Sequence, residues 1–211
     1  MNSLAQTPSA TIAQPRRNRL VGWSAIASGL ALIIVGEKPY FPPSWNLGLL
    51  LTTLALYLSM IPIARWIATC LTARAGGDGV RGTRMAESIG VTGAGVAAAT
   101  ALLALPHWLP AVPAQILDTS SLGVIGLWLL VANAFALRIH LYNRGLTLLG
   151  LLAGLGWLLA ALLMWAELLT DAQGNLVPAL ESVRTLAGYV ASAFYLIWAL
   201  WLGIWLLTGK R

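Results

Sequence analysis

The sequence is poor in charged residues. Asp, Glu, Lys and Arg together make up 9% of the 211 residues, whereas an average soluble domain carries about 25%. Hydrophobic residues make up 58%. A water-soluble domain of this length needs charged side chains over most of its surface, so the composition excludes an ordinary soluble enzyme and a disordered chain. It predicts an integral membrane protein.

Cysteine and clustered metal-binding residues are also scarce. Cys70 is the single cysteine, so the chain forms no internal disulfide, and the sequence contains no Cys/His group with the spacing of a metal site. Acidic residues are missing from the middle of every predicted span, which gives an ion-coupled pump little support. We therefore predict no metal, no cofactor and no catalytic residue, and we expect that the protein is not an enzyme.

Six apolar runs are present, and each approaches the roughly 20 residues that a helix needs to cross a bilayer. We expect residues 1–15 to form a disordered tail and residues 16–211 to form a single domain. The second run should continue as a helix past Pro62. The predicted fold class is an all-α integral membrane protein, a bundle of six transmembrane helices. The expected spans are 20–36, 47–69, 89–105, 122–138, 146–166 and 186–207.

The few charges follow the predicted loops. With both termini in the cytoplasm, 11 of the 13 basic residues fall on the cytoplasmic side, and Lys38 and Arg184 fall on the other. Five of the seven acidic residues, Asp118 and Glu167 among them, also fall on that other side, in loops or at span ends. Cytoplasmic loops of membrane proteins carry excess Lys and Arg. The pattern predicts cytoplasmic N- and C-termini in the cell inner (cytoplasmic) membrane, and it explains the net charge of +6 without a nucleic-acid partner.

Small residues recur at helical spacing in two predicted spans. Gly90 and Ala94 lie four residues apart in the third span, and Gly150 and Gly154 do so in the fifth. Such faces let helix backbones approach closely in lipid. Packing within the bundle is the favoured explanation. The expected partners are the lipid bilayer and, through these faces, other membrane-protein subunits or a second copy of the chain.

Polar and aromatic residues within the spans are candidates for a ligand site. Isolated Asn, Ser and Tyr residues in a membrane bundle either line a pathway or bond to a neighbouring helix. Tyr189, Ser192 and Tyr195 recur at three-residue intervals and are expected to share one helix face. The speculative ligand-binding set is Trp128, Asn133, Trp157, Tyr189, Ser192 and Tyr195.

Basic residues flank a glycine-rich turn after the second span. Arg74, Arg81 and Arg84 lie on either side of residues 76–79, and we expect them to contact the phosphates of inner-leaflet lipids.

One short segment resembles a known family. Lys38-Pro39-Tyr40-Phe41-Pro42-Pro43-Ser44-Trp45 is similar to the Lys-Pro, Pro-Pro-x-Trp segment between the first two helices of the tryptophan-rich sensory protein (translocator) family. Members of that family have five helices and bind porphyrins and similar ligands, so the resemblance implies a ligand of that kind. The other predicted spans depart from the family's pattern, and a sixth span is present here.

The sequence favours a non-enzymatic role through helix packing, as an accessory or structural subunit or as a self-associating bundle. The alternative is a transporter or binding protein for a small apolar or amphipathic molecule, which requires the ligand-binding set to converge on one cavity. A lipid-modifying enzyme that uses the three arginines and His140 is the least supported hypothesis.

Overall fold

The computed structural model of the chain describes residues 15–36, 46–75, 80–104, 110–170 and 177–209. These residues form six α-helices: α1 (Pro15–Gly36), α2 (Asn46–Ala75), α3 (Val80–Ala104), α4 (Ala111–Arg138), α5 (Arg144–Thr170) and α6 (Val177–Thr208). All six are long and apolar enough to cross a membrane. The predictions of an all-helical fold and of six helices able to span a membrane are confirmed.

Several helices extend beyond the apolar runs. The helix α2 continues past Pro62 to Ala75, as expected. At a rise of 1.5 Å per residue, its 30 residues measure about 45 Å, which is longer than the hydrocarbon core of a bilayer. The helix α4 begins at Ala111, well before the expected start at residue 122, and therefore includes Asp118. The helix is therefore longer than the expected span 122–138, because the polar stretch 115–121 is also helical.

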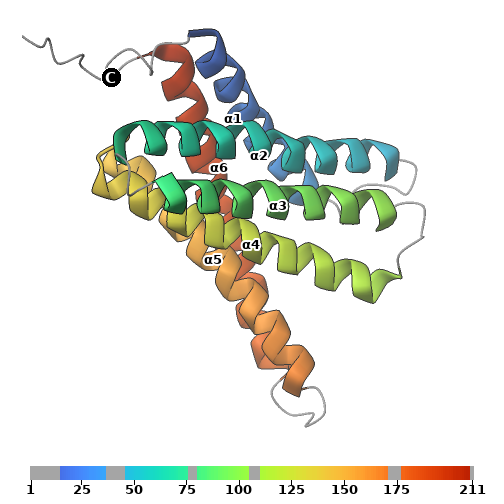
Figure 1. The fold of residues 1–211 in the computed structure, drawn as a ribbon. Helices are drawn as coiled ribbons and strands as arrows, with labels where there is room; N and C mark the ends of the chain where they lie inside the picture. Colours follow the sequence, from blue (N-terminus) through green and yellow to red (C-terminus); the bar gives the residue numbers. More distant parts are fainter. Residues whose placement is uncertain (1–14, 37–45, 76–79, 105–109, 171–176, 210–211) are drawn as a thin grey trace, which may run out of the picture.

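The helices form a closed ring in chain order. Each one packs against its neighbours in the sequence, and α6 returns to pack against α1. Across the ring, α2 and α4 make only sparse contact. In Figure 1, α2, α3 and α4 lie side by side, whereas α5 and α6 form a pair that crosses them steeply. Beyond that crossing, the described part of α6 before Ala191 has no buried residue.

Large and small residues alternate around the ring. The largest fully buried side chains come, with the exception of Leu146, from α2, α4 and α6. They include Met60 and Ile63 on α2, Trp128 on α4, and Tyr195 and Trp198 on α6. Buried positions of α1 and α3 hold mainly Gly, Ala, Ser and Thr. The large buried side chains of α2 and α4 therefore lie beside the small residues of α3, and those of α2 and α6 beside the small residues of α1.

Glycines bring α4 and α5 into backbone contact. A Cβ atom on Gly154 would lie 2.6 Å from the carbonyl oxygen of Gly126, and one on Gly126 would lie 2.7 Å from the carbonyl oxygen of Gly154. Distances this short exclude any side chain at either position. The crossing of the two helices therefore depends on both glycines.

Candidate functional site

The six residues of the predicted ligand-binding set do not form one site. Trp157, Ser192 and Tyr195 lie together between α5 and α6, and Asn133 belongs to a separate contact near the α4–α5 turn. Trp128 is buried against Gly90 of α3, where a Cβ atom would lie 2.8 Å from the indole ring. Tyr189 is 67% exposed and lies in the described part of α6 before Ala191, which has no buried residue. The shared face of Tyr189, Ser192 and Tyr195 stays a prediction.

The cluster on α5, α6 and α1 is closely packed. The indole Nε1 of Trp157 donates to Ser192 Oγ at 3.3 Å, and the Trp157 and Tyr195 rings lie 4.8 Å apart between centroids. The Tyr195 hydroxyl donates to Ser28 Oγ at 3.0 Å, and Ser28 in turn donates to the Ala25 carbonyl oxygen. This chain of donors ties the ring shut between α6 and α1.

Trp198 extends this cluster with an unused donor. Its ring lies 5.6 Å from that of Tyr195, and the whole residue is buried. Within the described part of the chain, its indole Nε1 has no hydrogen-bond acceptor. A buried donor without an acceptor destabilises a fold by about 1–3 kcal/mol, so this position is the one in the cluster that a polar atom of a ligand would satisfy.

Asn133 fastens the α4–α5 turn to α4. Its Nδ2 donates to the Leu129 carbonyl oxygen at 2.8 Å, and its Oδ1 accepts a 2.7 Å hydrogen bond from the hydroxyl of Tyr142. Gly150 of α5 makes room for the amide, because a Cβ atom there would lie 2.4 Å from Nδ2. Burial raises the pKa of the Tyr142 phenol, and Cys70 adds to the rise, so the hydroxyl keeps its proton and remains the donor.

Tyr57 and Asp118 form a buried contact that the sequence did not reveal. The Tyr57 hydroxyl of α2 donates to Asp118 Oδ1 of α4 at 2.7 Å. Tyr57 is buried, Asp118 is half-buried, and nearby on α4 the buried Ser120 Oγ has no partner within the described residues. The contact spans the ring between helices that otherwise barely touch. An acidic residue inside a candidate span carries a cost in lipid that such a partner reduces.

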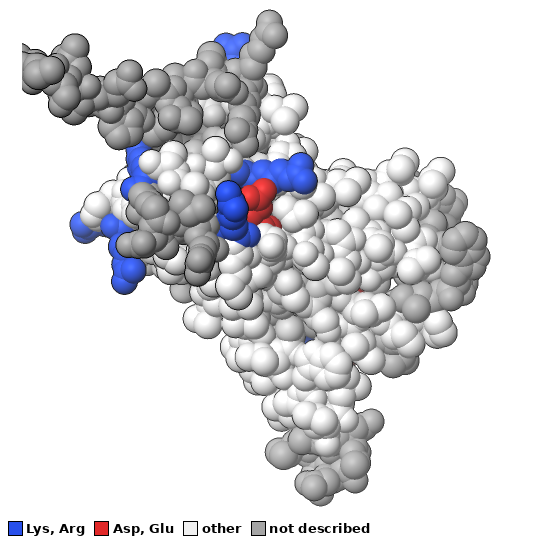
Figure 2. Space-filling model, viewed as in Figure 1, with Lys and Arg blue, Asp and Glu red and all other residues white. Residues whose placement is uncertain are grey.

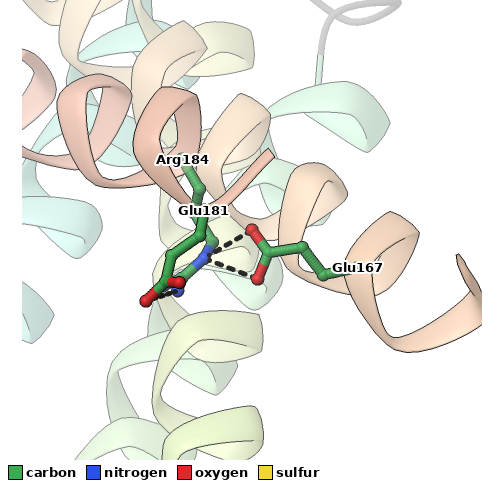
Figure 3. A network of polar contacts seen from close by, with 3 residues as sticks. All are labelled: Glu167, Glu181 and Arg184. Carbon is green, nitrogen blue, oxygen red and sulfur yellow. Dashed lines mark hydrogen bonds and ion pairs between the residues drawn. The ribbon is translucent and has the colours of Figure 1, made fainter. Parts of the chain in front are cut away.

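Glu167 and Arg184 form an ion pair between α5 and α6. The Arg184 Nε donates to both carboxylate oxygens of Glu167, at 2.9 and 3.0 Å, and Glu181 lies 4.0 Å from Nη2 (Figure 3). The side chains of Arg184 and Glu167 are only 17% and 13% exposed. The sequence predicted Glu167 to lie in a loop or at a span end. In the structure it is half-buried, and its ion pair joins α5 to α6 near the end of α5 and the start of α6.

Basic side chains gather at the opposite end of the bundle. Figure 2 shows Lys and Arg atoms where α2 and α4 end and α3 and α5 begin, while most of the face in view carries no charge. Arg74 and Arg84 are exposed there, and Arg81 lies in the first turn of α3. Arg65, on α2, lies 3.9 Å from Glu87 of α3. We call this the basic end.

The small residues predicted to form association faces lie inside the helix bundle. Gly90 packs against Trp128, Ala94 is fully buried, Gly150 packs against Asn133, and Gly154 crosses Gly126. A second chain that binds to this fold therefore has to use another surface.

A different set of residues faces outward, and four of its six members are small. Met85, Ser88, Thr92, Gly95, Ala99 and Leu102 recur at intervals of three and four along α3, and all are exposed. We call this set the α3 stripe. A Cβ atom on Gly95 would meet nothing within 4 Å.

The described residues contain no group of three or more His, Cys, Asp or Glu side chains arranged to hold a metal ion. The Lys38–Trp45 segment, the glycine-rich turn 76–79 and most of the predicted tail lie outside the described residues. Comparisons of the chain with protein-family models, with curated proteins and with solved structures gave no match.

Proposed function

We propose that the protein is a non-enzymatic membrane subunit that works through helix packing, with a partner helix seated on the α3 stripe. The supporting observation is the chemistry of that stripe. In lipid, small and hydroxyl residues mark faces where helices approach each other, since they add little contact with lipid chains. Ser88, Thr92, Gly95 and Ala99 occupy the outward face of α3.

The outward face of α5 is the internal reference for this proposal. It carries Leu at the corresponding three- and four-residue intervals from Leu148 through Leu152, Leu155 and Leu159 to Leu162, with a further Leu at position 169, and all of these are exposed. Such a face suits lipid chains. The polar and aromatic side chains of the interior clusters bond to and pack against one another. This arrangement favours a packing role over a chemical one.

The test uses two glycines that both have open space around them. Gly95→Leu fills the α3 stripe, while Gly48→Leu adds the same side chain to α2, where a Cβ atom also meets nothing within 4 Å. After gentle detergent extraction, we expect the wild type and Gly48→Leu to elute with a second chain and Gly95→Leu to elute alone. A wild type that is monomeric and free of partners, or two variants that behave alike, contradicts the proposal.

The proposed orientation places the basic end on the cytoplasmic side of the cell inner membrane. The gathering of arginines at one end supports this assignment, because cytoplasmic ends are rich in Lys and Arg. A reporter that fluoresces only in the cytoplasm, fused after Arg211, should be active. A reporter that is active only outside the cytoplasm should be silent there, and the opposite result reverses the orientation.

A binding role for a small apolar molecule is the second candidate, and it is supported by Trp198. The molecule would need one acceptor atom to reach the indole Nε1, which has no acceptor within the described residues. Mass spectrometry of small molecules released from the purified protein tests this role. Trp198→Phe should abolish the retention of any such molecule, whereas Trp165→Phe, on an exposed position of α5, should not.

A further inference from the structure

Three arginines surround the short turn between α4 and α5. Arg138 is the last residue of α4, Arg144 is the first residue of α5, and both are exposed. Arg74, in the last turn of α2, reaches the same turn: its Nη1 donates to the carbonyl oxygens of His140 and Leu141 at 3.3 and 3.4 Å. We call Arg74, Arg138 and Arg144 the turn patch.

Within the part of the chain that the structure describes, no ion pair neutralises the positive charge of the turn patch. The ion pairs within the described residues join Arg65 to Glu87 and Arg184 to Glu167 and Glu181. None of them involves the turn patch. The two carbonyl contacts orient the Arg74 guanidinium without cancelling its charge. Guanidinium groups held in this way bind phosphate through paired N–H donors.

The turn beneath the patch is held in one conformation. His140 has a φ of 50°, in the left-handed region, and the amide of Leu141 donates to the Ala136 carbonyl oxygen at 2.9 Å. Tyr142 is buried and bonded to Asn133, and Asn143 Oδ1 accepts from the Gly145 amide at the start of α5. The spacing of the patch is therefore set before any ligand binds.

The position of the patch matches the level of lipid phosphates. The candidate spans of α2 and α4 end at Arg74 and Arg138, and that of α5 begins at Arg144. Phosphates of a bilayer lie just outside the apolar segments of a spanning helix. We infer that the turn patch binds the phosphate groups of an anionic phospholipid and prefers a headgroup that carries two of them. Three neighbouring cations, one of them held by the turn, match two phosphates better than one.

A lipid bound here joins parts of the ring that otherwise barely meet. It links α2 to α4 and α5 at the basic end, where Arg74 of α2 contacts the turn between α4 and α5. The lipid should therefore stabilise the fold as well as bind to it. The inference requires that the protein lies in a bilayer, but it is independent of a partner on the α3 stripe.

The experiment measures lipid binding to the full chain in detergent. Native mass spectrometry and thermal unfolding are recorded with cardiolipin, which has two phosphates, with phosphatidylglycerol, with phosphatidylcholine and with inorganic phosphate. We expect cardiolipin to bind most tightly and to raise the unfolding temperature most. Replacing all three arginines of the turn patch by Gln should weaken cardiolipin binding on the order of 100-fold. The control set Arg17→Gln, Arg19→Gln and Arg65→Gln removes the same charge and should weaken it far less.

Two further results bear on the inference. The double variant Arg138→Gln/Arg144→Gln leaves the carbonyl contacts of Arg74 intact, so it should unfold like the wild type without lipid and still bind cardiolipin at least about tenfold more weakly. Equal losses in the patch and control sets mean that overall charge binds the lipid, and the inference is then wrong. An equal stabilisation by inorganic phosphate makes the ligand a free anion and also overturns it. If Gly95→Leu loses its partner but keeps lipid binding, the two proposals are separated.

Discussion

Two sets of glycines in this protein look alike in the sequence but lie in different surroundings. Gly126, Gly150 and Gly154 sit where a Cβ atom would lie 2.4–2.7 Å from a neighbouring helix, whereas Gly48, Gly95 and Gly188 would meet nothing within 4 Å. The first group, which faces inward, brings α4 and α5 into close contact. The second group faces outward, and Gly95 lies in the α3 stripe. In lipid, the position of a small residue matters more than its presence, because apolar burial does not distinguish inside from outside.

The largest expected effect tests the inward group. Gly154→Val places a branched side chain 2.6 Å from the Gly126 carbonyl oxygen, so α4 and α5 must separate. We expect a loss of about 3 kcal/mol or more in the free energy of unfolding, measured in mixed micelles. Gly48→Val, on the outward group, should change it by less than about 0.5 kcal/mol. Similar losses for the two variants would remove the distinction.

The two ion pairs that join neighbouring helices extend the comparison to charge. Arg184→Gln leaves Glu167 half-buried without its cation, and we expect a loss of about 2 kcal/mol. Arg65→Gln breaks a 3.9 Å pair in which the Arg65 side chain is 61% exposed, and its cost should be close to zero. The same unfolding measurement decides, and an equal cost for both variants contradicts the assignment of Arg184–Glu167 as the structural pair.

The contact between Asn133 and Tyr142 should have a smaller effect. Tyr142→Phe removes one buried hydrogen bond and should destabilise the fold by about 1 kcal/mol. Because Asn133→Ala also strands the Tyr142 hydroxyl, the double variant should cost less than the sum of the two single variants. A double-mutant cycle measures the difference, and strict additivity shows that the 2.7 Å contact does not contribute.

The smallest effect is expected at the Tyr195 hydroxyl. Tyr195→Phe keeps the aromatic packing against Trp157 and Trp198 and removes the bond to Ser28. A loss of about 0.6 kcal/mol is the average for one hydrogen bond between membrane helices. Tyr189→Phe, on the exposed side of α6, serves as the control. If Tyr195→Phe costs no more than the control, the hydrogen bond to Ser28 does not contribute, and packing alone holds α6 against α1.

The helices themselves were predictable from the sequence. Each apolar run approaches the length that a bilayer demands, and the structure has a helix at each of the six runs. The start of α4 was not predictable by that route, because Asp118 and the neighbouring hydroxyl residues lower the hydropathy of a stretch that is helical. The partner of Asp118, Tyr57, comes from a distant part of the chain.

The sequence also did not predict which face of each helix points into the bundle. A helix in water shows its buried side by an apolar stripe, but lipid-facing and inward residues of a membrane helix are equally apolar. Tyr189 and Tyr195 illustrate the result: six residues of helix turn them about 120° apart, and one is 67% exposed while the other is fully buried. The sequence placed both in one site, and only the contact of α6 with α1 separates them.

The closure of the ring makes its assembly depend on chain order. The Tyr195 hydroxyl finds its acceptor, Ser28, 167 residues earlier in the chain, and Gly203 of α6 packs against Gly22 of α1. As helices enter the membrane one after another, the inward face of α1 remains open to lipid, or to another protein, until α6 arrives. The sixth helix thus covers the inward face of the first. Between the insertion of α1 and that of α6, a helix of another protein can take the place of α6 on that face.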